Sequence, residues 1–307
     1  MRERVRTLLQ SNRFISLGLI LLMTLVAWSY LVTMTTHMRP FMDMGEMGPG
    51  MQIFNQSPVI SDLEGWQLTA EMRSLLLCRS PLSETGAGDQ SYFGMPQLGQ
   101  SWLPLDFLVV FTMWVMMMIA MMLPTASPMI MTYSDILANQ GSRRLTFAGT
   151  GLFILGYLLV WSAFSVVAVL GQWLLLQSGI LNDMMVSSSP ALSAGLLIAA
   201  GGYQFSSLKT ACLTHCRTPL QFFLSSWKPG YGGALRMGSR HGVYCVGCCW
   251  GLMLVMFFAG VMNLLWIAGL SLLMLFEKIL PRGDLFGRLI GAALIVAGAW
   301  ILGVEFI

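Results

Sequence analysis

The chain has 307 residues, of which 56% are hydrophobic and only 10% are charged, and its mean hydropathy is +0.70. Several apolar runs approach or exceed the roughly 18 residues that a helix needs to cross a bilayer. This composition excludes an ordinary soluble protein, and no basic cluster with interleaved aromatic residues points to nucleic acid. We therefore predict an all-α fold, a polytopic transmembrane helical bundle in a lipid bilayer.

A basic segment followed by a long apolar run opens the chain. Residues 1–13 carry four arginines, and residues 14–35 form the first predicted span. The run is too long for the apolar core of a signal peptide, and no small-residue cleavage site follows it. We expect residues 1–36 to be a cytoplasmic N-terminus and a retained membrane anchor.

Residues 37–104 form a polar segment that we expect outside the cytoplasm. Its first part, residues 37–51, contains one histidine and five methionines in an acidic, Gly- and Pro-containing stretch. Core packing does not explain methionines in such a stretch, whereas thioethers bind Cu(I) and need no deprotonation. We predict copper capture here, with a disordered loop as the alternative. The candidate ligands are His37, Met38, Met42, Met44 and Met47.

The second predicted span, residues 105–123, is also rich in methionine. Six of the ten residues from 113 to 122 are methionines, and some of them recur at every fourth position. Packing explains any one of them better than metal binding does. The number exceeds what packing requires, so Met117 and Met121 are kept as candidate metal ligands.

Five further spans complete a six-helix metal-binding domain over residues 105–307. Basic loops are expected at 124–146 and 209–242. The fourth span has an optional extension to Cys216. The spans are residues 147–177, residues 190–207, residues 243–258, a sixth span ending at Glu277 and Lys278, and residues 289–305.

The distribution of Lys and Arg predicts the orientation of these seven spans. If the N-terminus is cytoplasmic, the cytoplasmic loops hold 14 basic residues and the other side holds three. Positive charge accumulates on the cytoplasmic side of membrane proteins. We therefore expect the N-terminus inside and the C-terminus outside. The short turn at residues 260–263 is the weakest point, since fusing its flanking spans would reverse the C-terminus.

Two groups of cysteine and histidine carry the candidate metal chemistry. On a helix, the spacing of four, seven or eight residues after His241 places its partners on one face. Thiolate and imidazole together are ligands for Cu(I) or Zn. We expect both groups to meet in one site at the cytoplasmic face, where thiols stay reduced. The first group is Cys212, His215 and Cys216, and the second is His241, Cys245, Cys248 and Cys249.

Other interpretations of these residues remain open. Cys245 and Cys248 also fit a redox dithiol, which would make the protein a thiol–disulfide enzyme. Glu277 and Lys278 are expected to reach the membrane interface from a helix end rather than to relay protons. Gln204, Lys209 and Asn263 are expected to pair between helices. No P-loop or nucleophile–base motif is present, so no catalytic residue is predicted.

From about residue 105 to the C-terminus, the chain resembles a bacterial family of predicted metal-binding integral membrane proteins. The matching stretches are MWVMMMIAMMLPTASP, GYLLVW, GYQFSSLKTACLTHCRTPL, GSRHGVYCVGCCWGLMLVMFFAGVMN and EKILP. The resemblance implies a helical membrane fold that binds metal. It implies no activity, and it does not extend to residues 37–104.

Together these features predict a multi-pass protein of the bacterial plasma membrane that handles copper, with zinc as the alternative metal. Its task would be transport, delivery or cuproenzyme assembly, with a metallochaperone or a cuproenzyme as partner. An accessory or structural subunit of a larger membrane protein complex is the main alternative function.

Overall fold

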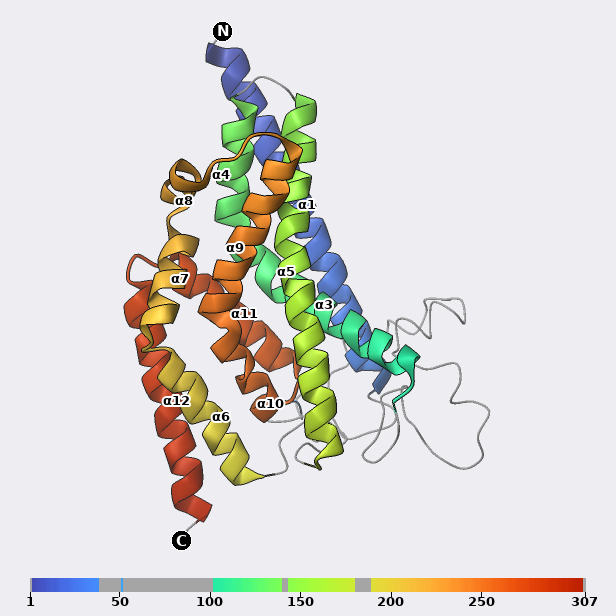
Figure 1. The fold of residues 1–307 in the computed structure, drawn as a ribbon, viewed down its shortest axis with the longest axis vertical. Coiled ribbons are helices and arrows are strands. Elements are labelled where there is room, and N and C mark those ends of the chain that lie inside the picture. The colour runs from blue at the N-terminus through green and yellow to red at the C-terminus, as the bar shows by residue number, and fades with distance from the viewer. Residues whose placement is uncertain (1, 39–50, 52–101, 140–142, 180–188, 306–307) are drawn as a thin grey trace.

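The computed structural model describes residues 2–38, 51, 102–139, 143–179 and 189–305, and every extended element in them is a helix (Figure 1). This confirms the predicted all-α class. Five helical segments are long and apolar enough to cross a membrane. They are Arg13–Thr35, Pro104–Thr125, Arg144–Gln177, Gly230–Ala259 and Gly283–Val304.

The N-terminal helix α1 (Arg2–Met38) packs along α3 (Pro104–Thr125) and α4 (Ser127–Ala138). Arg13 of α1 forms a two-pronged ion pair with Asp135 of α4, at 2.6 Å for the closest pair of atoms. The predicted anchor is therefore part of the bundle. Helix α1 also continues to Met38, so the first two residues of the predicted Met/His stretch are helical.

Helix α5 (Arg143–Gln177) and helix α9 (Gly230–Met253) cross in close contact. A Cβ atom at Gly238 of α9 would lie only 2.0 Å from the backbone oxygen of Phe153 in α5. Small residues allow two helix backbones to approach in this way. This crossing holds α5 and α9 in fixed register, and both helices line the candidate site.

The basic segment predicted as a loop over residues 209–242 is mostly helical. Helix α6 (Pro190–Tyr203) ends at Gln204, and α7 (Ser207–Arg217) begins after Ser206, whose side chain accepts a hydrogen bond from Lys209 N. Helix α8 (Pro219–Ser226) follows, and α9 begins at Gly230 instead of near Val243. The amphipathic α7 and the glycine-rich start of α9 lack a long apolar run, so the hydropathy of the sequence does not mark these two segments as helices.

The C-terminal part of the chain contains α10 (Val255–Ala259), α11 (Leu264–Ile279) and α12 (Gly283–Glu305). Gly260 has φ of 94°, which suits glycine, and it turns the chain between α10 and α11. Asn263 then caps α11 by accepting hydrogen bonds from Leu265 N and Trp266 N. Helix α12 pairs with α6 at one side of the bundle (Figure 1).

The fourth and sixth predicted spans correspond to short helices. Helix α6 has 14 residues and α11 has 16. At about 1.5 Å per residue, helices of this length cover roughly 21–24 Å, less than the ~30 Å hydrocarbon layer. Helix α11 instead enters the bundle, packs on α3 and brings its C-terminal end to the thiols of α9.

Candidate metal centre

Four cysteine thiols converge between α7 and α9. The sulfur atoms of Cys245, Cys248 and Cys249 all lie within 4.8 Å of one another. The sulfur of Cys216, on α7, lies 3.9 Å from that of Cys248. All four side chains are buried and none forms a disulfide. We call these four residues the thiol cluster.

The thiol cluster lies in the interior of α9, not at its end. The helix begins at Gly230, so Cys245 follows fifteen residues of helix, about 22 Å of its length. The fifth span was predicted to begin at residue 243, so the cysteines lie deeper within a helix than expected. Burial of each thiol at 0–1% exposure in α9 separates the cluster from the surface of the protein.

Helix α7 brings the first predicted group of residues against the second. Cys216 reaches the thiol cluster, while the Cys212 side chain packs on Gly247, where a Cβ would lie 2.7 Å from its sulfur. His215 stacks on Tyr244 with ring centroids 4.3 Å apart. Burial raises the pKa of the Cys212 thiol, and a hydrogen bond with Cys245 together with burial raises the pKa of Cys216. A metal would therefore displace protons from these thiols.

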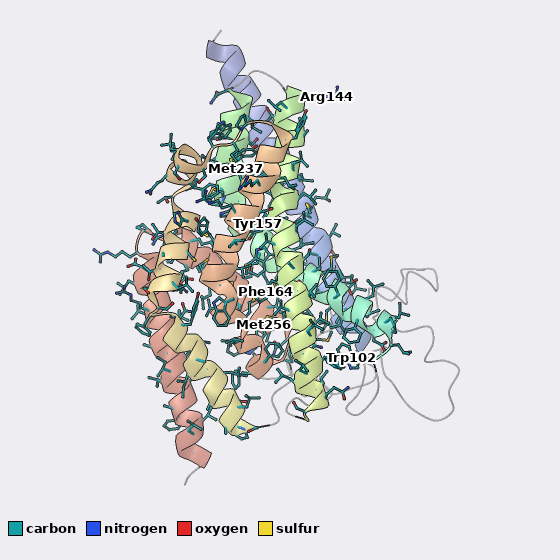
Figure 2. The ribbon with its side chains drawn as sticks, in the orientation of Figure 1. Trp102, Arg144, Tyr157, Phe164, Met237 and Met256 are labelled. Atoms are coloured by element: carbon teal, nitrogen blue, oxygen red, sulfur yellow. The ribbon has the colours of Figure 1, made fainter. Side chains whose placement is uncertain are left out.

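A buried lysine contacts the thiol cluster from α11. Lys278 Nζ donates to Cys245 Sγ at 3.0 Å and to Thr125 Oγ1 at 2.8 Å. The Tyr157 hydroxyl, on α5, lies 3.1 Å from the same sulfur and donates to the Met122 carbonyl oxygen at 3.0 Å. Figure 2 shows Tyr157 on α5 in the central part of the bundle. Helices α3, α5 and α11 therefore all position Cys245.

The expectation that Glu277 and Lys278 reach the membrane interface is wrong. Glu277 is 1% exposed and Lys278 is 8% exposed, because the end of α11 is covered by its neighbours. Glu277 forms an ion pair with Lys209 of α7 at 2.5 Å, and Lys209 also donates to Gln204. The expected pairing of polar residues between helices is confirmed for Lys209. Lys278 takes part in none of the ion pairs found among the described residues.

His241 lies one helical turn before Cys245 and is 1% exposed. Its ring packs among the rings of Tyr157, Phe222 and Phe153, at centroid distances of 5.4, 6.0 and 6.2 Å. Its ring nitrogens are not part of the group of ligand atoms within 4.8 Å of one another, which contains only the sulfurs of Cys245, Cys248 and Cys249. The structure therefore places this predicted ligand next to the thiol cluster but not within it.

The methionine candidates fall into two classes. Met117 and Met121 of α3 are completely buried in the hydrophobic core, where α3 meets α1, α5 and α11. Their position agrees with packing and gives no separate support for metal binding. Met42, Met44 and Met47 lie outside the described residues, as do the side chains of His37 and Met38.

The geometry of the thiol cluster suits a soft metal ion. With a metal–sulfur bond of about 2.3 Å, sulfurs on opposite sides of one ion stand about 4.6 Å apart. The three α9 sulfurs lie within 4.8 Å of one another, and those of Cys248 and Cys249 are 3.3 Å apart, so one ion could contact all three. Thiolates select Cu(I) and Zn(II), and the ammonium group of Lys278 would offset part of their negative charge. The sequence analysis assigned Lys278 to the membrane interface and not to this site. The feature that could have indicated its role is its place beside Glu277 in the EKILP stretch.

Comparison with known proteins agrees with this chemistry. A family model described as the PpoB2 copper chaperone matches residues 111–301, which is more than half of the chain and includes the whole thiol cluster. No curated protein and no solved structure shows significant similarity to the chain. The match confirms the metal-handling family that the resemblance implied. The chain belongs to the PpoB2 copper chaperone family.

Proposed function

We propose that this protein is a membrane copper chaperone that carries Cu(I) on Cys216, Cys245, Cys248 and Cys249. The observation that supports this most directly is the buried convergence of four free thiols from α7 and α9. Copper is the cargo in this proposal, bound for a time and then passed to a cuproenzyme or a second metallochaperone. Zinc, which prefers four ligands, is the competing ion.

Burial of the thiol cluster supports carriage of an ion more than thiol–disulfide exchange. Exchange requires a thiolate that can reach the disulfide of another protein. The cluster thiols are at most 7% exposed, so another polypeptide would not reach them without opening the bundle. A metal ion is small enough to enter between helices.

The first test replaces a thiolate with a hydroxyl of similar size. Cys245→Ser and Cys248→Ser should each lose most of the bound copper, because oxygen is a poor ligand for Cu(I). Elemental analysis of protein purified without a metal-binding tag measures this loss, and Cys78→Ser is the matched control. Unchanged copper in both α9 variants would refute the assignment of the thiol cluster.

We also propose that the Met/His stretch of residues 37–47 captures copper on the extracytoplasmic side of the bacterial plasma membrane. Simultaneous substitution of Leu for Met38, Met42, Met44 and Met47 removes every thioether of this stretch and keeps the apolar bulk. Cells that carry this variant should need more external copper to load the thiol cluster, while the copper affinity of the thiol cluster itself, measured on purified protein, stays unchanged. Equal loading at limiting copper would show that the stretch is not a capture site.

A further inference from the structure

The imidazole of His241 is a buried polar group whose polar atoms are unsatisfied. The side chain is 1% exposed, and neither Nδ1 nor Nε2 has a hydrogen-bond partner among the described residues. Buried polar groups are nearly always hydrogen-bonded, and each exception requires an explanation such as a water molecule or an ion. The membrane-like interior of the bundle makes an unsatisfied nitrogen still more costly.

The surroundings of His241 explain its ring but not its nitrogens. The rings of Phe153, Tyr157 and Phe222 pack around the imidazole and offer it apolar contact. The Tyr157 hydroxyl is already engaged by the Met122 carbonyl and the Cys245 sulfur. A phenylalanine would fill this aromatic environment as well as a histidine does, so packing alone does not account for an imidazole here.

Soft donor atoms lie on both sides of His241 along α9. Met237 precedes it by four residues and Cys245 follows it by four, and both are buried. Side chains four residues apart on a helix are neighbours, with Cβ atoms about 5–6 Å apart. Figure 2 shows Met237 closer than Tyr157 to the end of the molecule that carries Arg144. Met237 and His241 therefore lie between that end and the thiol cluster.

We propose that Met237 and His241 form a second Cu(I) position, separate from the thiol cluster, through which copper enters or leaves Cys245. This inference rests on the proposed function, and it adds a path for the cargo. A thioether and a neutral imidazole are both ligands for Cu(I). They carry no negative charge, so they hold the ion less tightly than the neighbouring thiolates.

A weaker position beside a tight one matches the task of a chaperone. An ion bound only by buried thiolates leaves slowly, because each sulfur must be replaced before the ion is free. A ligand pair one helical turn away can accept the ion while it is still held by Cys245. The ion then crosses the helix interior in short steps, without passing unligated through an apolar region where a bare charge is costly.

The experiment titrates the full-length, reduced protein with Cu(I) against a competing chelator in the absence of oxygen. In every protein compared, including the one called wild type below, Leu replaces the proposed capture ligands, which are His37, Met38, Met42, Met44 and Met47. The wild type should bind a tight first ion with sulfur ligands and a weaker second ion. X-ray absorption at two equivalents should then show an added nitrogen ligand. His241→Phe should lose the second ion and its nitrogen signal, and Met237→Leu should weaken it. The first ion should remain tight in both variants.

Met113→Leu is the matched control, because Met113 is a fully buried methionine on α3 and outside both proposed copper positions. It should bind both ions like the wild type. The inference is overturned if the wild type binds one ion with sulfur alone, if His241 and cysteines hold one shared ion, or if His241→Phe keeps the second ion. The wild-type spectrum decides the matter even if His241→Phe does not fold.

These outcomes separate the inference from the proposed function. Loss of the second ion in His241→Phe with a normal first ion supports both. A wild type that binds only the first ion, which Cys245→Ser removes, refutes the second position alone. A first ion that survives Cys245→Ser and Cys248→Ser refutes the proposed function itself.

Discussion

Lys278 brings a positive charge into the bundle beside the thiols of α9. Its ammonium group lies 3.0 Å from Cys245 Sγ, and no ion pair among the described residues includes it. An isolated buried charge is costly. A Cu(I) ion held by two thiolates and two neutral thiols of the cluster gives a net charge of −1, so Lys278 would make the loaded centre neutral. The free-energy cost of burying the Lys278 ammonium group in the copper-free protein is therefore offset when copper binds.

Replacing Lys278 with Met tests this charge balance. The loaded centre would keep an uncompensated negative charge, so copper affinity should fall by about 10- to 100-fold, as for other outer partners of metal ligands. Stability of the copper-free protein should stay the same or rise, since a buried ammonium becomes an apolar chain. Chelator competition and denaturant unfolding measure the two effects.

The control for Lys278→Met is Lys228→Met, which removes an exposed lysine from the segment between α8 and α9. It should change neither measurement. Equal losses of affinity and stability in Lys278→Met would indicate a purely structural lysine, and an unchanged copper affinity would rule out charge compensation.

The sequence predicted the thiols of this centre better than their surroundings. Helical spacing was enough to group Cys245 with Cys248 and Cys249, because they share one helix. Assigning Cys216 to the same site required one further assumption, that the two groups of cysteines lie on neighbouring helices that pack together. Lys278 was wrongly expected at the membrane interface because a charged residue near a helix end normally reaches water, and only the tertiary packing of α11 shows otherwise.

At the scale of helices, the close crossing of α5 and α9 supports the site. Gly156 and Gly238 let α5 and α9 touch backbone to backbone, which fixes Tyr157 against Cys245. The ion pair between Lys209 and Glu277 ties α7 to α11 in the same way, beside Cys216 and Lys278. Four of the helices around the site, α5, α7, α9 and α11, are thus joined in pairs by contacts just outside it.

Gly238→Ala should loosen the crossing of α5 and α9. The added methyl would lie 2.0 Å from the backbone oxygen of Phe153, which cannot rotate away as a side chain does, so the helices must separate. We expect a loss of unfolding free energy of about 1–3 kcal/mol, together with weaker copper binding. Denaturant unfolding in detergent and chelator competition measure both.

Gly232→Ala is the matched control, because it lies on the same helix with nothing within 4 Å of the added methyl. Alanine favours helix over glycine, so this variant should be unchanged or more stable by at most about 1 kcal/mol. Similar behaviour of the two variants would mean that the close approach at Gly238 has no role in stability.

The helices themselves were predictable to different degrees. The apolar runs that became α3 and α5 lie within a few residues of their predicted bounds. The first half of α9 was predicted as loop, and α7 only as an optional extension of the fourth span to Cys216, because their basic and glycine residues lower hydropathy. They form helices because neighbouring elements cover their apolar faces, and hydropathy does not record such tertiary burial.

On the scale of the whole molecule, the fold places the N-terminus and the C-terminus at opposite ends of the bundle. Figure 1 shows the N-terminus and the C-terminus at opposite ends of the bundle, with the start of α9 on the side of the N-terminus. Lys209 and Lys278 are buried in the bundle, and without them the basic residues of the predicted loops still favour a cytoplasmic location for that side, by 12 to three. Under this orientation, Met237 and His241 face the cytoplasmic side of the thiol cluster, which would be the exit for copper captured outside.

Reporter cysteines at the two ends test this orientation. Tyr231 at the start of α9 is 49% exposed, and Val304 near the end of α12 is 60% exposed, so a cysteine at either position would be accessible to a reagent. In a background with Cys78→Ser and Cys212→Ser, Val304→Cys should react with a membrane-impermeant maleimide in intact spheroplasts. Tyr231→Cys should react only after the membrane is opened, because the reagent does not cross the bilayer. The background protein without either reporter is the control, and its remaining cysteines are buried. The opposite pattern would reverse the orientation and make the Met237–His241 side the entrance for copper.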